Sequence, residues 1–173
     1  MKKNLPVTQH EKPFIKGKYI VSKTDLKGSI TYANDAFIEM SGFTYEELLG
    51  KNHNIVRHPD VPPQAFADLW ESLKEDRPWR GIVKNRAKNG DHYWVDALVV
   101  PIRKDNQTIG YMSVRTEATR QQIAAAEPLY LALNASGKTI PRPSAWCKVT
   151  LRTKMFSLAL GLILLQALSA VSG

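Results

Sequence analysis

Three consecutive β-prone runs, joined by two short turns, occupy the centre of this sequence. The first run spans residues 79–86 and leads into residues 88–91, whose Asn-Gly pair is the strongest short-range signal for a β-hairpin. The second run spans residues 92–103, and a short turn leads into the third run, residues 108–116. Two hairpins in series pair their strands in opposite directions. The centre of the chain is therefore predicted to form an antiparallel sheet.

The alternation of side chains along these runs predicts which residues face the interior. In the second run the inward-facing set is wholly apolar: Val95, Ala97 and Val99. In the third run we assign the more apolar set to the inside, and it consists of Gly110, Met112 and Val114. The alternate set is then assigned to the outside: Tyr111, Ser113 and Arg115.

In the first run the same alternation directs an amide inward. Gly81 and Val83 face the interior, and this brings Trp79 and Asn85 to the same side. An unpaired amide in an apolar concavity costs about 1–3 kcal/mol, so Asn85 needs a hydrogen-bond partner. A carboxamide offers a donor and an acceptor together, which matches the acceptor–donor edge of a flavin's pyrimidine ring. A plainer interpretation also stands, in which Asn85 bonds to backbone at the edge of its strand.

The N-terminal half supplies a further hairpin and short helices. Residues 19–24 and 29–33 are β-prone and flank a turn. Asn34 occupies the N-cap position of a helix that ends at Gly42, and a capping box at residues 44–47 begins a second short helix. Two strands, short helices and three strands in this order indicate an α+β fold.

A short loop and the helix after it concentrate chemically active side chains. The loop holds a cation, Arg57, an imidazole, His58, and a carboxylate, Asp60, before two prolines that begin the helix. Because prolines have no N–H, Asp60 cannot be an ordinary N-cap and needs another partner. Phe66 and Trp70 then lie on one apolar helix face. A basic mouth beside an aromatic wall suits a ligand with an anionic tail and a flat head, but the same residues also suit a charged loop before an ordinary core helix.

The two ends of the chain differ from its centre. Residues 1–18 are lysine-rich without a strong period, so we expect a loosely ordered arm. Residues 155–173 carry no charge, and at ~1.5 Å per residue they span roughly 28 Å, close to the ~30 Å hydrocarbon core of a bilayer. We expect a transmembrane segment there, either as a tail anchor or as the start of the membrane part of a longer receptor. Residues 119–154 are expected to form a helical linker, broken or kinked at Pro128, and a basic juxtamembrane segment.

Charge and composition exclude several classes of function. The formal net charge is +8, but the basic residues after Glu127 gather before the apolar segment, which predicts a cytoplasmic domain held at the inner membrane and no nucleic-acid binding. Cys147 is the only cysteine, so neither an intrachain disulfide nor a cysteine-based zinc site can form. No nucleophile–base pair, phosphate-cradling glycine loop or metal-spaced cluster is present, so we do not expect an enzyme.

Several segments resemble the PAS domain family. Residues 22–42, SKTDLKGSITYANDAFIEMSG, resemble its opening, and residues 88–102, KNGDHYWVDALVVPI, resemble its central hairpin. Residues 57–70, 81–95 and 123–135 are more specifically similar to the branch of the family found in bacterial aerotaxis receptors. The resemblance implies a PAS sensor domain over residues 19–118, with a five-stranded antiparallel sheet and short helices on one face, followed by a C-terminal helix and the transmembrane segment.

This branch binds FAD and reports redox state, so the resemblance implies a non-enzymatic energy-taxis sensor. Arg57, His58 and Asp60 stand where the family binds or organises FAD, Trp79 where an indole contacts the flavin, and Asn85 where light-sensing relatives place an asparagine on the ring edge. The full set of candidate cofactor-binding residues is Asn34, Arg57, His58, Asp60, Phe66, Trp70, Trp79 and Asn85. A homodimer and downstream signalling modules or a chemotaxis kinase complex are the implied partners.

Two departures from the light-sensing branch limit what can be carried over. The loop at residues 54–57 reads Asn-Ile-Val-Arg and lacks the photoactive cysteine, so no flavin–thiol adduct can form. Met112 stands where that branch has a glutamine near the reactive flavin nitrogen. Three alternatives stay open: FMN in place of FAD, a haem ligated by His58 or His92, and a cofactor-free module that dimerises.

Overall fold

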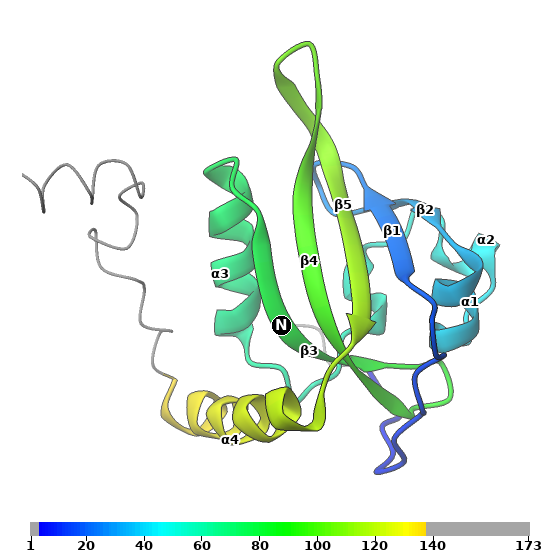
Figure 1. Ribbon diagram of the computed structural model, residues 1–173, viewed down its shortest axis with the longest axis vertical. Helices are drawn as coiled ribbons and strands as arrows, with labels where there is room; N and C mark the ends of the chain where they lie inside the picture. The colour runs from blue at the N-terminus through cyan, green and yellow to red at the C-terminus, as the bar shows by residue number, and fades with distance from the viewer. Residues whose placement is uncertain (1–3, 138–173) are drawn as a thin grey trace, which may run out of the picture. The chain divides into compact units, whose positions relative to one another are not determined.

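A five-stranded antiparallel sheet organises the computed structural model, which describes residues 4–137 (Figure 1). The strand order is β2-β1-β5-β4-β3. The strands are β1 (Ile20–Thr24), β2 (Ile30–Ala33), β3 (Trp79–Arg86), β4 (His92–Lys104) and β5 (Gln107–Glu117). All five predicted strands are thus confirmed, with ends displaced by a residue or two.

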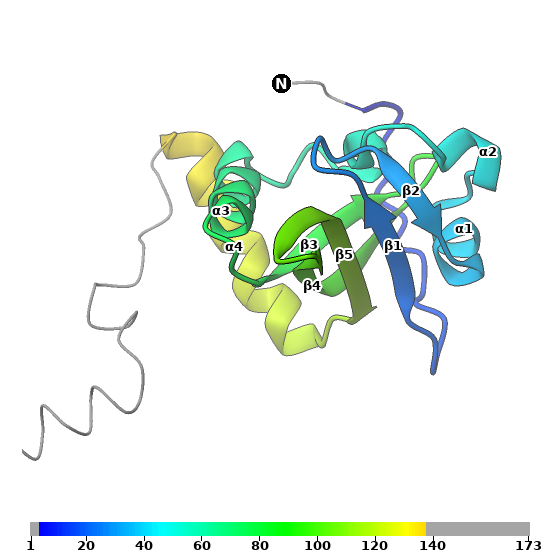
Figure 2. The same cartoon turned by 90° about the horizontal axis from the view of Figure 1, so that it is seen from above.

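Short helices cover one face of the sheet and a longer helix crosses the other (Figure 2). The inner-face elements are α1 (Asp35–Ser41), α2 (Tyr45–Leu48), the 3-10 helix η1 (His53–Val56) and α3 (Pro63–Lys74). The outer-face helix is α4 (Arg120–Ser136), whose Tyr130 ring stacks on Trp94 with centroids 6.4 Å apart. The predicted α+β arrangement is confirmed.

The helix ends form for the reasons that the sequence indicates. The Asn34 side chain accepts a hydrogen bond from the Phe37 N–H, and the capping box of Thr44 and Glu47 is complete. The prolines at 62 and 63 begin α3 without a side-chain cap. Of the break or kink predicted at Pro128, the break does not occur, because α4 runs through the proline as one helix. Contacts to the sheet on both sides of that proline, from Gln122 to Asp96 and from Tyr130 to the Ile82 carbonyl, hold the two halves in one helix.

One irregularity in the β4–β5 hairpin decides which face of β5 points inward. Arg103 pairs with Thr108, but Ile102 pairs with Gly110, so Ile109 is an extra residue in β5. A regular hairpin would pair Val99 with Met112, as the sequence prediction requires. The bulge instead pairs Val99 with Ser113, and a one-residue shift exchanges the two faces of a strand. The predicted inward set of Gly110, Met112 and Val114 is therefore wrong, and Tyr111, Ser113 and Arg115 face the interior.

The N-terminal arm is not loosely ordered over its described residues. Its backbone pairs with the start of β4, where the Thr8 N–H donates to the Gly90 carbonyl and the Lys12 N–H to the His92 carbonyl, at 2.9 and 2.7 Å. The buried Arg86 side chain also donates to backbone carbonyls of the arm, at Leu5 and Pro6. Propensity alone missed this packing because the partners are eighty residues away in the chain.

Within residues 4–137 no helix has the length and apolar character needed to cross a membrane. The predicted transmembrane segment, residues 155–173, and the basic segment before it lie outside the described residues.

Gly110, which follows the bulge, is predicted to be unusually sensitive to substitution. A Cβ at Gly110 would collide with the Thr24 carbonyl oxygen on the neighbouring strand, so Gly110→Ala is expected to lower the free energy of unfolding by about 2–3 kcal/mol. Gly50→Ala is the control, because nothing lies within 4 Å of its Cβ and only its positive φ opposes the change, at about 1 kcal/mol. Urea unfolding measures both variants. Equal losses in the two would contradict the close approach of β5 to β1.

Candidate functional site

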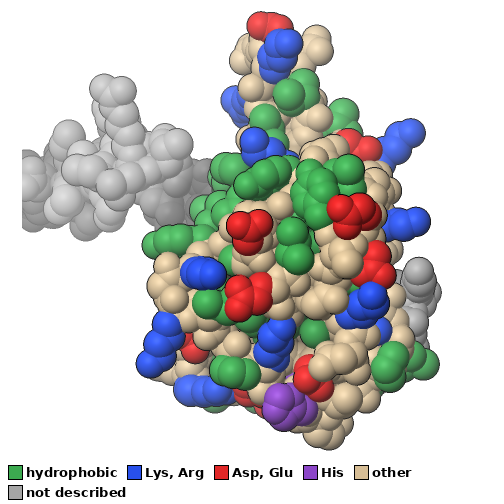
Figure 3. Space-filling view, turned by 90° about the vertical axis from the view of Figure 1, so that its right-hand side faces the viewer, with side chains coloured by type: hydrophobic (Ala, Val, Ile, Leu, Met, Phe, Trp, Pro, Cys, Tyr) green, Lys and Arg blue, Asp and Glu red, His purple; other side chains and the backbone are tan. Residues whose placement is uncertain are grey.

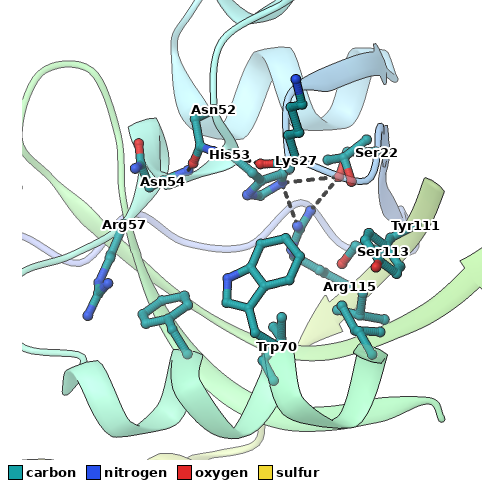
Figure 4. A pocket seen from close by; sticks show the side chains of 16 residues that line it. Ser22, Lys27, Asn52, His53, Asn54, Arg57, Trp70, Tyr111, Ser113 and Arg115 are labelled. Atoms are coloured by element: carbon teal, nitrogen blue, oxygen red, sulfur yellow. Dashed lines mark hydrogen bonds between the residues drawn. The ribbon is translucent and has the colours of Figure 1, made fainter. Parts of the chain in front are cut away.

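A cavity of about 390 Å³ lies between α3, η1 and the inner face of the sheet, within the ~300–1,000 Å³ range of ligand pockets (Figure 4). Its lining comes from β1, the turn after it, the η1 region, α3, β4 and β5. The lining residues are Ser22, Thr24, Lys27, Gly28, Asn52, His53, Asn54, Arg57, Phe66, Leu69, Trp70, Leu73, Val99, Tyr111, Ser113 and Arg115.

One wall of the cavity is apolar and flat. It is the predicted face of α3, formed by Phe66, Leu69, Trp70 and Leu73. The Trp70 indole meets the Tyr111 ring edge-on, with centroids 5.8 Å apart. Gly28 allows the turn after β1 to approach this indole, since a Cβ there would lie 3.1 Å from Trp70. Aromatic side chains therefore define one side of the space.

The other walls carry positive charge without any acidic residue. Lys27, Arg57 and Arg115 line the cavity, and no Asp or Glu does. On the face drawn in Figure 3, by contrast, acidic and basic side chains are interspersed. The cavity is thus a locally cationic site on a mixed surface, and it favours an anionic ligand.

Arg115 forms the centre of a small buried network. Its guanidinium donates to His53 Nε2 at 2.7 Å and to Ser22 Oγ at 3.3 Å, as Figure 4 shows. Burial lowers the pKa of Arg115 to about 10, so it stays charged at neutral pH. Desolvation, followed by the charge of Arg115, lowers the pKa of His53 to about 3. His53 is therefore neutral at pH 7 and its Nε2 can accept the hydrogen bond.

Two further polar side chains on the cavity wall hold atoms without partners. Arg57 is 8% exposed, stacks over the Phe66 ring at 3.8 Å and donates to the Val61 carbonyl, but its Nε is buried without a hydrogen bond. Ser113 is 7% exposed and its Oγ is also buried and unpaired. Such atoms are costly to bury, so they indicate a missing partner.

Of the predicted site residues, Arg57, Phe66 and Trp70 meet in this cavity, and the others do not line it. The Asn34 amide has a structural role: its Oδ1 accepts from the Val21 and Phe37 N–H groups, and its Nδ2 donates to the Tyr19 carbonyl. The Trp79 indole is buried between sheet and helix, where its Nε1–H donates to Asp68 on α3 at 2.8 Å.

His58 and Asp60 lie on the far side of the loop, toward α4. The Asp60 carboxylate pairs with Lys84 Nζ at 2.7 Å, which confirms that it needed a partner other than the helix N-terminus. Partial burial raises the pKa of Asp60, but the hydrogen bond and charge of Lys84 outweigh it and hold the pKa below its usual value. His58 Nδ1 accepts from the Asp60 N–H, and its buried Nε2 has no partner. Its ring meets that of His92 edge-on at 5.8 Å.

Asn85 faces inward as predicted, and its amide is not satisfied. It is 5% exposed, pairs with Tyr93 across the sheet, and forms a bridge through its backbone with Arg57. Its Nδ2 is buried without a hydrogen bond. The plainer interpretation, in which backbone groups satisfy this amide, is therefore wrong for the amide's N–H donor, Nδ2.

Sequence reasoning missed the polar wall formed by His53, Ser113 and Arg115. Two of these were assigned to the outer face of β5 because the alternate residues are more apolar. Met112, predicted to lie near a reactive flavin nitrogen, is on the outer face instead and does not line the cavity. The bulge that reverses the faces of β5 becomes visible only once the pairing of β5 with β4 is known. A single sequence does not contain that information.

Comparison with known proteins is consistent with this geometry. Residues 30–115 match the family model described as PAS fold. The chain is 56% identical over 136 residues to an aerotaxis receptor from Escherichia coli, which covers 79% of this chain and 27% of that protein. It is 34% identical over 82 residues to a nitrogen fixation regulatory protein from Klebsiella pneumoniae, covering 47% of this chain and 17% of that protein. The chain thus spans less than a third of these relatives.

Solved structures show the same fold at low sequence identity. A LOV protein from Rhodobacter sphaeroides superposes with a TM-score of 0.55 at 22% identity, covering 65% of this chain and 68% of that one. The PAS domain of a protein from Colwellia psychrerythraea gives a TM-score of 0.54 at 22% identity, covering 59% and 87%.

The buried imidazole at position 58 predicts acid sensitivity. Desolvation lowers the pKa of His58 to about 4 in the folded state, against a usual value near 6.5. Between these values the unfolded chain binds more protons, so stability falls as the pH falls from about 6.5 toward 4. His58→Gln should remove roughly 2 kcal/mol of the loss in unfolding free energy between pH 7 and pH 5. Urea unfolding at the two pH values decides, and parallel losses in wild type and H58Q would refute the assignment.

Proposed function

Residues 30–115 of this chain form a PAS domain, and on that premise we propose that the protein is a redox sensor that holds FAD in the cavity beneath α3. The observation that carries the proposal is the lining itself: a flat aromatic wall faces cations and buried polar atoms, and within residues 4–137 no carboxylate lines the cavity and no group pairs with those polar atoms. A planar ring would pack on the aromatic wall, and its polar edge would pair with the buried polar atoms. A phosphate-bearing tail would supply the negative charge for the cations.

The residues that would hold the cofactor divide by chemistry. Phe66 and Trp70 offer apolar surface to a planar ring. Ser113 presents an unpaired hydroxyl on the cavity wall, suited to the polar edge of that ring. Asn85, whose amide donor is also unpaired, faces inward outside the cavity lining. Arg57 and Lys27 offer charge to the pyrophosphate. FMN would make the same ring contacts and its phosphate would meet the same cations, so FMN is the alternative cofactor in this proposal.

When bound, the flavin supplies reversible electron uptake, which changes the charge and the hydrogen-bonding pattern at its ring. The protein's own groups then report that change. Ser113 and Arg115, which line the cavity, would each gain or lose a hydrogen bond, and about 1–3 kcal/mol of differential interaction moves a two-state element by population shift.

The loop between η1 and α3 connects the cavity to the outer face of the sheet. Arg57 lines the cavity, while three residues later the Asp60 carbonyl accepts from Asn134 on α4 at 2.8 Å. The Asp60 carboxylate holds Lys84, which is adjacent in β3 to the inward-facing Asn85. A change at the cavity wall therefore has a short route through this loop to α4, the element that leads into the linker.

We place this sensor in a membrane-bound chemotaxis pathway. The similarity to an aerotaxis receptor supports energy taxis as the process, without enzymatic activity in this chain. Residues 155–173 would anchor the chain in the inner membrane with the PAS domain in the cytoplasm, as a homodimer that signals to downstream modules or a chemotaxis kinase complex. Haem is not favoured, since neither His58 nor His92 lines the cavity.

The proposal predicts a yellow protein whose colour depends on the inner face of β5. The full chain, purified from membranes, should show flavin absorption, and denaturing extraction should release FAD. Ser113→Phe should fill the cavity and lower flavin occupancy at least about tenfold, equivalent to ~1.4 kcal/mol. Met112→Phe is the matched control on the adjacent outward position and should keep its flavin.

A wild-type chain that is colourless and takes up no FAD would reject the proposal in favour of a cofactor-free interaction module. A Soret band in place of flavin absorption would support the haem alternative. Equal flavin loss in S113F and M112F would show that the cavity is not the binding site.

A further inference from the structure

Arg115 is a buried cation that the described residues leave without a counter-ion. It is 6% exposed and forms no salt bridge with an acidic group of the described chain. Every acceptor that it contacts through a side-chain hydrogen bond is neutral: Ser22 Oγ and His53 Nε2. These two hydrogen bonds to neutral groups do not cancel its charge.

The remaining titratable groups around Arg115 do not cancel that charge either. Burial raises the pKa of the Tyr93 phenol, so it stays protonated and uncharged. His53 is uncharged at neutral pH for the reason given above. Lys27 and Arg57, which line the same cavity, carry the same sign as Arg115. The cavity therefore has a positive potential from three sides of its wall.

A buried charge of this kind is costly unless an opposite charge approaches it. Elsewhere in the described chain the buried cation Lys84 has a carboxylate partner, Asp60, at 2.7 Å, and the buried Arg86 donates to the backbone carbonyls of Leu5 and Pro6. Arg115 differs because its open side is the cavity. The missing negative charge is therefore expected on the ligand, at the end of the cavity where β5, β1 and η1 meet.

We infer that Arg115 makes the cavity hold the reduced flavin ring as an anion. This inference rests on the proposed function, since it requires a flavin in the cavity. Acid dissociation of a bound reduced flavin would release a proton to solvent and leave the negative charge on the ring, and the guanidinium of Arg115 on the cavity wall would stabilise that charge. A nearby opposite charge favours the charged form of such a group.

The same contact gives Arg115 a part in signalling. An anionic ring competes with His53 and Ser22 for the N–H groups of the guanidinium. His53 belongs to η1, which leads into the loop toward Asp60, and Ser22 belongs to β1. Charge on the ring is thereby coupled to the loop that contacts α4.

The test is a pH titration of the reduced, flavin-loaded full chain. Anaerobic protein is reduced with dithionite, and the absorption spectrum follows the neutral and anionic forms of the reduced flavin. The acid dissociation constant of the bound ring is expected to be at least tenfold larger in wild type and Arg115→Lys than in Arg115→Gln. Arg80→Gln is the control, since Arg80 pairs with Asp96 on the outer face and should leave the constant unchanged.

Each outcome separates this inference from the proposed function. A flavin-loaded wild type with the same constant as a flavin-loaded R115Q overturns the role of Arg115 and leaves FAD binding intact. A wild type that binds no flavin overturns both. If R115Q does not fold, the wild type is compared with free FAD in the same buffer. A dissociation constant at least tenfold larger in the protein supports the inference, and an equal or smaller one overturns it.

Discussion

The extra residue in β5 determines the chemistry of the cavity, because every side chain beyond it on that strand is exchanged between the two faces. With Ile109 unpaired, Ser113 lies opposite Val99 and Arg115 lies opposite Ala97. Without it, a methionine and a valine would occupy the inner face and the hollow would be an apolar core. Gly110 makes this geometry possible, since β5 passes so close to β1 that no side chain fits there. The polar wall, the cation at its centre and the proposed ligand all depend on this local register.

Charge is distributed differently on the two faces of the sheet. On the outer face, basic side chains meet carboxylates, as Arg80 meets Asp96 and Lys84 meets Asp60. On the inner face, Arg57 and Arg115 are buried against neutral acceptors and aromatic rings. The outer-face ion pairs lie where α4 packs on the sheet, since Gln122 donates to Asp96 and Asn134 donates to the Asp60 carbonyl. The inner-face cations have no carboxylate partner among the described residues, so they favour a ligand of opposite charge. The loop from Arg57 to Asp60 joins the two, because Arg57 lines the cavity and the Asp60 carbonyl accepts a hydrogen bond from Asn134 on α4.

Local sequence patterns predicted most of the fold and, of the site, its aromatic wall and Arg57. Caps, prolines and alternating runs placed the strands and short helices, because these signals act over a few residues. The apolar face of α3 and the inward direction of Asn85 followed from periodicity in the same way. The face of β5 did not, because a bulge is set by the neighbouring strand and not by propensity. The packing of the arm on β4 and the continuity of α4 through Pro128 likewise depend on partners distant in sequence.

The central claim is that a flavin ring occupies the space between Trp70 on α3 and Ser113 on β5. A crystal structure of the FAD-loaded chain measures this directly. The account predicts electron density for the ring against the aromatic wall, with a ring edge within hydrogen-bonding distance of Ser113 or Arg115. Density for the flavin anywhere outside this cavity, or a cavity closed by its own side chains in a yellow protein, would contradict it.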